Sequence, residues 1–275
     1  MRTDGAAAGQ DPPSYDFNSI KTMQRSKRKA LGQHFLRDPN IVRKMMLRAE
    51  IQPNETVVEI GPGRGVLTRA LNETGSKIFA IELDRSLDEP LQKEFKDSPN
   101  VRIIHADALT YPFEDIPAPF AVVANLPYSI STPLLFRLLE LRSRVSRMVL
   151  MLQWEVARRI VAREGGKEYG LLSIGVQFYA EPRLEFIVPR GCFSPKPKVD
   201  SAVIRLRIRP TPRVAVKDEP FFFRVVRAGF GHRRKSLRNA LKDGGFPADA
   251  VEEALDAASI TTGNPQRRAE TLSIE

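Results

Sequence analysis

The sequence predicts an α/β fold, with a parallel sheet covered by helices on both faces and a smaller, all-helical segment after it. Short apolar segments alternate with helical ones as far as about residue 180. A glycine-rich turn follows the first of these apolar segments, at 61–65. From about Glu219 onward the pattern is helical only. Such alternation is typical of parallel sheets, because the chain needs a crossover to return to the same end of the sheet.

The expected elements follow in a regular order. The first helix has Asp38 as its N-cap and Pro39 at its first position, which suits both residue types. Apolar segments predict strands at 56–60, 77–83, 101–107, 120–126 and 147–153, and then at 183–188 and 201–208. Helical segments are expected at 65–73, at 86–95, from about Ser131 and at 155–164.

Three regions are expected from this order. Residues 1–24 are rich in Gly, Ala, Pro, Asp and Ser, and we expect a disordered extension with neither a secretory signal nor a transit peptide. Residues 25–210 form the expected α/β domain. The segment 209–214 is the expected linker to an all-helical domain at 211–275.

Composition narrows the class of partner. The 275 residues include 43 Lys and Arg against 33 Asp and Glu, which gives a net charge of +10. This excess suits a polyanionic partner such as RNA, although a solvated basic surface is an equally good explanation. A single cysteine, Cys192, excludes an internal disulfide and suits a reducing compartment. We therefore expect a cytoplasmic monomer with no membrane partner, since no apolar run approaches the roughly 18 residues of a spanning helix.

The glycine-rich turn points to a ligand. Gly61, Gly63 and Gly65 allow a tight turn and a close approach of the backbone to a bound molecule. A dinucleotide fingerprint would need its third glycine one position later. The observed pattern is E-x-G-x-G-x-G, beginning at Glu59, and it resembles the S-adenosylmethionine loop of Rossmann-like class I methyltransferases.

Acidic residues follow the next two predicted strands. Glu82 lies at the end of the second strand, where a carboxylate can accept hydrogen bonds from both ribose hydroxyls of a nucleoside. Asp107 lies at the end of the third strand and could accept a hydrogen bond from the exocyclic amine of the cofactor's adenine. Either acid alone could be a surface residue. Together with the glycines, they predict a nucleoside site at the carboxyl edge of the sheet.

The segment "NLPY", residues 125–128, follows the fourth strand at the same edge. The exocyclic nitrogen of adenine is a poor nucleophile, because its lone pair is delocalised into the ring. The side-chain oxygen of Asn125 and the carbonyl near Leu126 could accept its hydrogens, while Pro127 removes a competing N–H and stiffens the turn. Tyr128 offers a face on which a base can stack. A simple turn would use the same residue types, but the glycine loop favours methyl transfer to an adenine amine, by positioning and charge complementarity.

Further segments make the chain similar to a known family. They are "LGQHFLRD" (31–38), "IELDR" (81–85), "NLPYSISTPL" (125–134), "CFSPKPKVDSAVIRL" (192–206) and "GFGHRRKSLRNAL" (229–241). With the glycine loop, and in this order, they resemble the ribosomal RNA small-subunit adenine dimethyltransferase family, and in particular its bacterial members. The resemblance covers about residues 27–275.

The resemblance implies roles for individual residues. His34 and Leu36 would contact S-adenosylmethionine, with His34 in place of the family's usual Asn and able to bind the methionine carboxylate. Glu59, Gly61, Gly63, Glu82, Asp107 and Asn125 fall on the other cofactor positions. Asn125, Leu126, Pro127 and Tyr128 fall on the catalytic motif, and Phe193 would stack on the target base. No metal is expected.

The implied substrate is a pair of adjacent adenines in a hairpin loop near the 3′ end of 16S rRNA, within the immature small ribosomal subunit. Each would receive two methyl groups in the course of ribosome biogenesis. Loop adenines suit an enzyme that must reach a base outside a stack. Basic residues on both sides of the expected pocket would hold RNA phosphates: Lys196, Lys198, Arg224, Arg227, Arg233, Arg234, Lys235 and Arg238.

Two alternatives remain open from the sequence. A related resistance methylase modifies an adenine of large-subunit 23S rRNA. A ribosome-assembly factor that binds nucleic acid without catalysis would share the fold. The segments at 192–206 and 229–241 disfavour the first alternative, and the intact glycine loop and "NLPY" disfavour the second.

Overall fold

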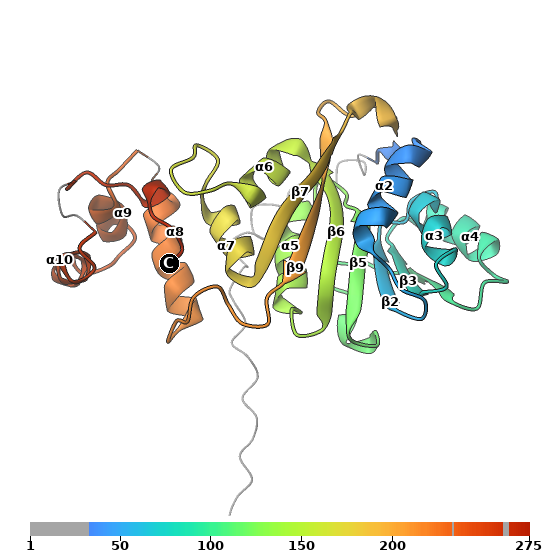
Figure 1. Cartoon of the computed structure of the whole chain (residues 1–275), viewed down its shortest axis with the longest axis horizontal. Helices are drawn as coiled ribbons and strands as arrows, with labels where there is room; N and C mark the ends of the chain where they lie inside the picture. Colours follow the sequence, from blue (N-terminus) through green and yellow to red (C-terminus); the bar gives the residue numbers. More distant parts are fainter. Residues whose placement is uncertain (1–32, 233, 261–263) are drawn as a thin grey trace, which may run out of the picture.

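The computed structural model describes residues 33–232, 234–260 and 264–275. In these residues a seven-stranded sheet has the order β4-β3-β2-β5-β6-β9-β7, most of which can be followed in Figure 1. A second sheet pairs β1 with β8. The strands are β1 (Phe35–Leu36), β2 (Thr56–Ile60), β3 (Lys77–Glu82), β4 (Val101–His105), β5 (Phe120–Asn125), β6 (Val145–Gln153), β7 (Ala180–Val188), β8 (Phe193–Ser194) and β9 (Ser201–Ile208).

Helices cover both faces of the large sheet and then form the end of the chain (Figure 1). The helices are α2 (Pro39–Ala49), α3 (Val66–Asn72), α4 (Arg85–Glu94), α5 (Ser131–Glu140), α6 (Trp154–Val161), α7 (Leu171–Tyr179), α8 (Glu219–Gly231), α9 (Leu237–Asp243) and α10 (Ala248–Ala257). The N-cap prediction for α2 is confirmed, because the Asp38 side chain accepts a hydrogen bond from the backbone N–H of Asn40 at 2.9 Å.

The core lies on both sides of the sheet. Alternate residues of β5 point to opposite faces, so Val122 joins the apolar cluster under α5, α6 and α7, whereas Val123 joins the cluster under α2 and α3. A strand buried on both faces needs apolar side chains at every position. This explains the unbroken apolar run at 120–124.

The parallel sheet expected from the alternating part of the chain is confirmed for β4, β3, β2, β5 and β6, whereas no strand direction was predicted for the segment that forms β9. β9 runs antiparallel to both β6 and β7. β7 and β9 are antiparallel because the segment between them contains no crossover helix, which would be needed to bring the chain back to the same end of the sheet.

Helix α7 is absent from the sequence-based expectations, since its residues are nearly all buried and show no amphipathic period.

The helical end of the chain packs against the sheet domain through aromatic rings. Phe178 of α7 stacks on Phe222 of α8, with ring centroids 4.9 Å apart, and meets Phe223 edge-on at 5.3 Å. The hydroxyl of Tyr179 donates to the carboxylate of Glu219 at 2.6 Å. These contacts fix where α8 begins relative to the sheet, while the domain boundary near residue 210 stays a prediction.

Candidate active site

The glycine loop connects β2 to α3 by left-handed backbone. Gly61, Gly63 and Gly65 have φ values of 67°, 59° and 74°, which only glycine adopts without strain. A Cβ on Gly65 would lie 2.9 Å from the side chain of Leu91. A Cβ on Gly63 would lie 3.2 Å from the ring of Phe35. The glycines are therefore required by the backbone and by the space that their neighbours leave.

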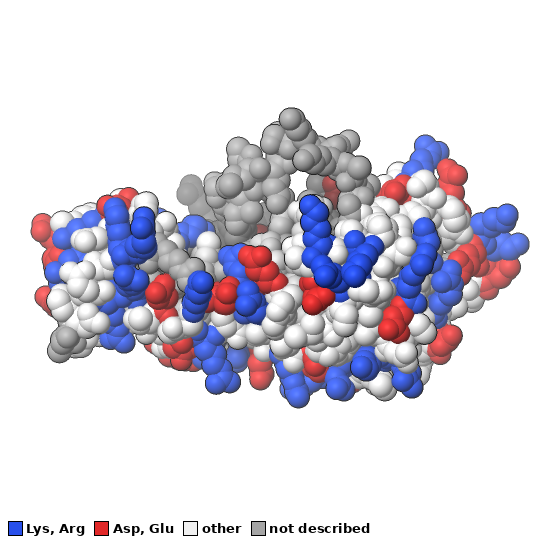
Figure 2. All heavy atoms as spheres, turned by 90° about the horizontal axis from the view of Figure 1, so that it is seen from above, with Lys and Arg blue, Asp and Glu red and all other residues white. Residues whose placement is uncertain are grey.

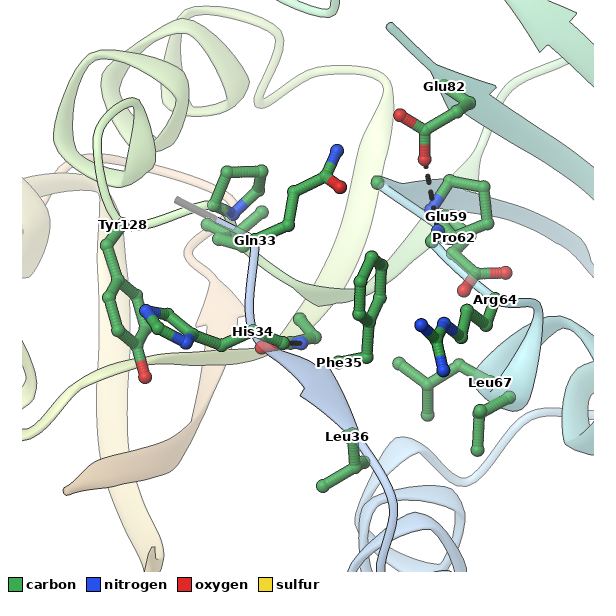
Figure 3. A pocket seen from close by; sticks show the side chains of 16 residues that line it. Gln33, His34, Phe35, Leu36, Glu59, Pro62, Arg64, Leu67, Glu82 and Tyr128 are labelled. Carbon is green, nitrogen blue, oxygen red and sulfur yellow. Dashed lines mark hydrogen bonds between the residues drawn. The ribbon is translucent and has the colours of Figure 1, made fainter. Parts of the chain in front are cut away.

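The same pocket contains the glycine loop and the residues after β5 (Figure 3). A Cβ on Gly61 would lie 3.5 Å from Pro127 and 4.0 Å from the carbonyl oxygen of Asn125. Leu126 and Tyr128 also line this pocket, together with His34, Leu36, Glu59 and Glu82. The two segments that the sequence analysis assigned to methyl donor and acceptor thus face one cavity, at the carboxyl ends of neighbouring parallel strands.

Two buried carboxylates line the pocket. Glu82 accepts hydrogen bonds from the backbone N–H groups of Gly63 at 3.0 Å and Asp84 at 2.9 Å. Burial nevertheless raises its pKa above the ordinary value, because desolvation outweighs these two bonds. Glu59 is 1% exposed, and its carboxylate accepts a bond from the Thr68 hydroxyl at 2.7 Å. Desolvation raises the pKa of Glu59 to about 8.

Hydrogen bonds orient the predicted catalytic residues. The amide nitrogen of Asn125 donates to the backbone carbonyl of His34 at 3.4 Å, which leaves the side-chain oxygen as an acceptor. The hydroxyl of Tyr128 lies 2.6 Å from that of Ser201. Burial raises the pKa of Tyr128 above its ordinary value, so the phenol stays uncharged. The backbone N–H of Leu126 is bonded to Met151, and its side chain is buried.

A small antiparallel sheet joins the N-terminal segment to the loop after β7. Phe35 and Leu36 in β1 pair with Ser194 and Phe193 in β8. Phe193 is 4% exposed and packs beside Leu36 in the apolar cluster under α2. Its ring packs against other apolar side chains in this arrangement, and its role in stacking on the target base stays a prediction.

The imidazole of His34 points away from the glycine loop. Its Nδ1 lies 2.7 Å from the carbonyl oxygen of Pro195, and its ring lies 5.6 Å from that of Tyr128 (Figure 3). Because Nδ1 is bonded to Pro195, Nε2 is the ring nitrogen of His34 that remains for the expected bond to a methionine carboxylate. His34 lies in the pocket, as expected, on the side of Tyr128.

Asp107 is not among the residues that line the pocket. It lies two residues beyond β4, and its carboxylate accepts a bond from the backbone N–H of Leu109 at 2.9 Å. This bond holds the loop after the strand in a turn. The hydrogen bond from the cofactor's adenine amine to Asp107 remains a prediction.

The predicted phosphate-binding residues are spread over the surface, and Figure 2 shows Lys and Arg with Asp and Glu among them along the whole face. Arg227, Arg234, Lys196 and Lys198 are exposed. The other described members have internal partners: Lys235 pairs with Asp243, Arg238 with Glu252, and Arg224 lies over the rings of Phe221 and Phe246. Arg233 lies outside the described residues.

Several pocket residues were not singled out by the sequence analysis. Gln33 donates to Asp84 at 3.1 Å, and Phe35 closes the pocket over Gly63. Both belong to the segment 31–38, which carried the family resemblance, so their position in that motif was the available signal. No local signal connected Ser201 to Tyr128, because 73 residues separate them.

The pocket fits S-adenosylmethionine by its chemistry. Glycines leave room for a ligand against the backbone, and Glu82 keeps further lone pairs for ribose hydroxyls. The carboxyl oxygens of Glu59 and Glu82 can accept hydrogen bonds from ammonium and hydroxyl groups of the ligand. In the described part of the chain, no group of three or more His, Cys, Asp or Glu side chains could hold a metal ion, and no helix has the length and apolar character to cross a bilayer.

Sheet order, glycine loop and site together define a Rossmann-like methyltransferase of class I, the S-adenosylmethionine-dependent type. Comparisons with known proteins narrow this class. Residues 24–274 match the family described as ribosomal RNA adenine dimethylase. The chain therefore belongs to this family, and the resemblance seen in the sequence is confirmed.

Individual relatives agree with this assignment. The chain is 48% identical to the ribosomal RNA small subunit methyltransferase A of Moorella thermoacetica, over 90% of this chain and 89% of that protein. It is 44% identical to the protein of the same description from Pelotomaculum thermopropionicum, over 90% and 88%.

Two solved structures resemble the fold. A dimethyladenosine transferase from Plasmodium falciparum has a TM-score of 0.72 at 26% identity and covers 87% of this chain and 93% of its own. The 23S rRNA methyltransferase ErmE has a TM-score of 0.66 at 31% identity, with coverages of 86% and 96%. The chain thus shares its fold with a dimethyladenosine transferase and with a 23S rRNA methyltransferase.

Proposed function

We propose that this chain transfers methyl groups from S-adenosylmethionine to the exocyclic amines of two adjacent adenines in the 3′-terminal hairpin loop of 16S rRNA, within the immature small ribosomal subunit. Each adenine is dimethylated, and the released product is S-adenosylhomocysteine. The observation that carries the proposal is the shared pocket of Gly61 and Asn125, because donor and acceptor must meet there. The reaction belongs to ribosome biogenesis.

The cofactor supplies an electrophilic methyl group on its sulfonium. Glu82 holds the ribose, and the glycine loop lets the ligand lie against the backbone. The side-chain oxygen of Asn125, left free by the bond of its amide nitrogen to His34, accepts one hydrogen of the adenine amine. The carbonyl of Leu126 accepts the other, so the nitrogen lone pair turns toward the methyl group.

Tyr128 positions the base. Its ring is held by the bond to Ser201 and offers a stacking face at the pocket edge. Base stacking on an aromatic ring contributes roughly 1–3 kcal/mol. Phe193 would stack on the opposite face only after leaving its apolar cluster. Pro127 keeps the turn rigid, and no group of the chain needs to form a covalent bond.

Exposed cations on the surface would hold the RNA backbone. Lys196 and Lys198 follow Phe193, and Arg227 and Arg234 belong to the helical end. Such contacts fix the position of the RNA without reading its sequence. The remaining expectations belong to the same proposal: a cytoplasmic monomer, a helical RNA-binding domain after about residue 210, and no metal.

Modification of large-subunit RNA is the less favoured function. It is supported by the fold of ErmE at 31% identity. The small-subunit relatives are more similar, at 48% and 44% identity, and span nearly the whole chain. A non-catalytic assembly role is disfavoured because Asn125 retains a free acceptor in the donor pocket.

The test is tritium transfer from labelled S-adenosylmethionine to small subunits from a strain that lacks this modification. Label on the two loop adenines, located by mass mapping, is expected. Already methylated small subunits are the matched control and should accept none. Label on large-subunit RNA alone would support the resistance-type reaction, and cofactor binding without transfer would support the assembly factor.

A further inference from the structure

Arg64 is a pocket residue without a role in the reaction described so far. It stands between Gly63 and Gly65 in the glycine loop and lines the pocket. Its guanidinium carbon lies 4.5 Å from the ring centroid of Phe35, above the ring face (Figure 3). A guanidinium stacked in this way keeps its N–H groups free at the edge of its plane. The stacking therefore holds the cation in place without using its donors.

The charge of Arg64 is also uncompensated within the part of the chain that the structure describes, where it forms no ion pair. Arg69 is the instructive contrast, because it lies on the next turn of the same segment and binds Glu94 through two nitrogens. An exposed arginine usually gains little from a surface ion pair. An arginine held at the edge of a pocket by an aromatic ring is placed to bind an anion that enters it.

Arg64 gives the pocket a positive charge that suits an anion. The two acidic side chains of the pocket are Glu59 and Glu82, whose oxygens suit hydrogen-bond donors of a ligand rather than an anion. His34, the expected partner of a carboxylate, has its Nδ1 2.7 Å from the carbonyl of Pro195, on the side of Tyr128. Arg64 is the arginine that lines the pocket among the described residues. S-adenosylmethionine carries one carboxylate beside its ammonium and sulfonium groups.

We propose that Arg64 binds the carboxylate of the cofactor's amino-acid end and so selects S-adenosylmethionine over analogues that lack this group. The inference rests on the proposed use of this cofactor. Its geometry assigns Arg64 the part that the family resemblance gave to His34. A bidentate pair between guanidinium and carboxylate supplies both attraction and orientation.

The test compares two ligands by isothermal titration calorimetry in the absence of RNA. The ligands are S-adenosylmethionine and decarboxylated S-adenosylmethionine, which keeps the sulfonium and amine. The wild-type chain should bind the first more tightly by about tenfold, as expected for a charge-assisted pair at a partly exposed site. Arg64→Gln should bring this affinity ratio close to one. Arg64→Lys should give an intermediate ratio, because lysine keeps the positive charge but lacks the two parallel N–H donors of the guanidinium.

Arg69→Gln is the matched control, since it removes the same charge from the helix that follows the loop, outside the pocket lining, and should leave the ratio unchanged. His34→Ala should also leave it unchanged. A wild-type ratio in Arg64→Gln would overturn the inference. So would loss of the ratio in His34→Ala alone, or an effect of Arg64→Gln confined to the salt dependence of RNA binding, which would make Arg64 a phosphate contact.

Failure of the inference and failure of the proposed function give different results. The affinity ratio is measured without RNA, whereas the proposed function is measured by label on the small subunit. A normal ratio with no label rejects the substrate. Label with no ratio, or with a ratio that Arg64→Gln retains, rejects the role of Arg64.

Discussion

Replacement of the buried Glu59 by glutamine should change how the stability of the protein depends on pH. The side chain is fully buried, and desolvation raises its pKa from 4.5 to about 8, against the lowering effect of the Thr68 hydroxyl. Between these two values the unfolded chain loses a proton that the folded chain keeps. The contribution of protonated Glu59 to the free energy of unfolding is therefore fully present below pH 4.5 and is lost as the pH rises through 8.

The magnitude follows from the size of the shift. Each unit between the two pKa values costs about 1.4 kcal/mol, so the loss reaches about 3 kcal/mol at pH 7 and about 5 kcal/mol above pH 8. Glu59→Gln keeps an oxygen for the bond from Thr68 and carries no charge. The variant should match the wild type near pH 5 and exceed its free energy of unfolding by about these amounts at pH 7 and 8.5.

Urea denaturation of the cofactor-free protein at pH 5, 6, 7, 8 and 8.5 measures the difference. Thr68→Val is the companion variant, because it removes the hydroxyl that lowers the pKa of Glu59 and should extend the loss of stability to higher pH. A constant difference between wild type and Glu59→Gln across this range would refute the reasoning. It would mean that the carboxylate is ionised in the folded protein throughout.

Four other variants test the site and the RNA surface. Asn125→Ala should abolish methyl transfer while cofactor affinity, measured by calorimetry, stays within about threefold, because one acceptor of the adenine amine is lost; transfer at the wild-type rate would contradict this. Ser201→Ala should lower kcat a few-fold, because it removes the hydrogen bond of roughly 1 kcal/mol that holds Tyr128, while cofactor affinity stays unchanged. An unaltered kcat would show that this hydrogen bond is not needed. Arg234→Ala should reduce the slope of log affinity for the small subunit against log salt concentration by about 0.7–0.9 in magnitude. Lys235→Ala should reduce it by less, because Lys235 already pairs with an acid. Slopes equal to that of the wild type in filter binding would place the RNA elsewhere.

Local spacing was enough to predict the strands that build the site. The boundaries at 56–60 and 201–208 agree with β2 and β9, and Asp38 caps α2 as expected. These features depend on residues close together in the chain, such as an apolar run ended by a turn. Helix α7 lacked such a signal, because residues buried on all sides show no period.

The pairing of distant segments was beyond such reasoning. β1 and β8 are two-residue strands, too short for any pattern, and their contact buries Phe193. The bond between His34 and Pro195 joins residues 161 positions apart. The direction of β9 depends on its neighbours in the sheet, since a strand's sequence does not encode which way its partner runs.

The sequence by itself determined the class of protein, the tight glycine turn and the set of residue types needed to move a methyl group to an adenine amine. These follow from local constraints, because a backbone with positive φ requires glycine and a strand end exposes the residues that come next. Only the tertiary structure decided that Gly61 and Pro127 line one pocket, that the imidazole of His34 turns to Pro195, and that Lys235 already has an acidic partner. Those outcomes depend on which surfaces pack together, and packing is a property of the whole chain rather than of any segment.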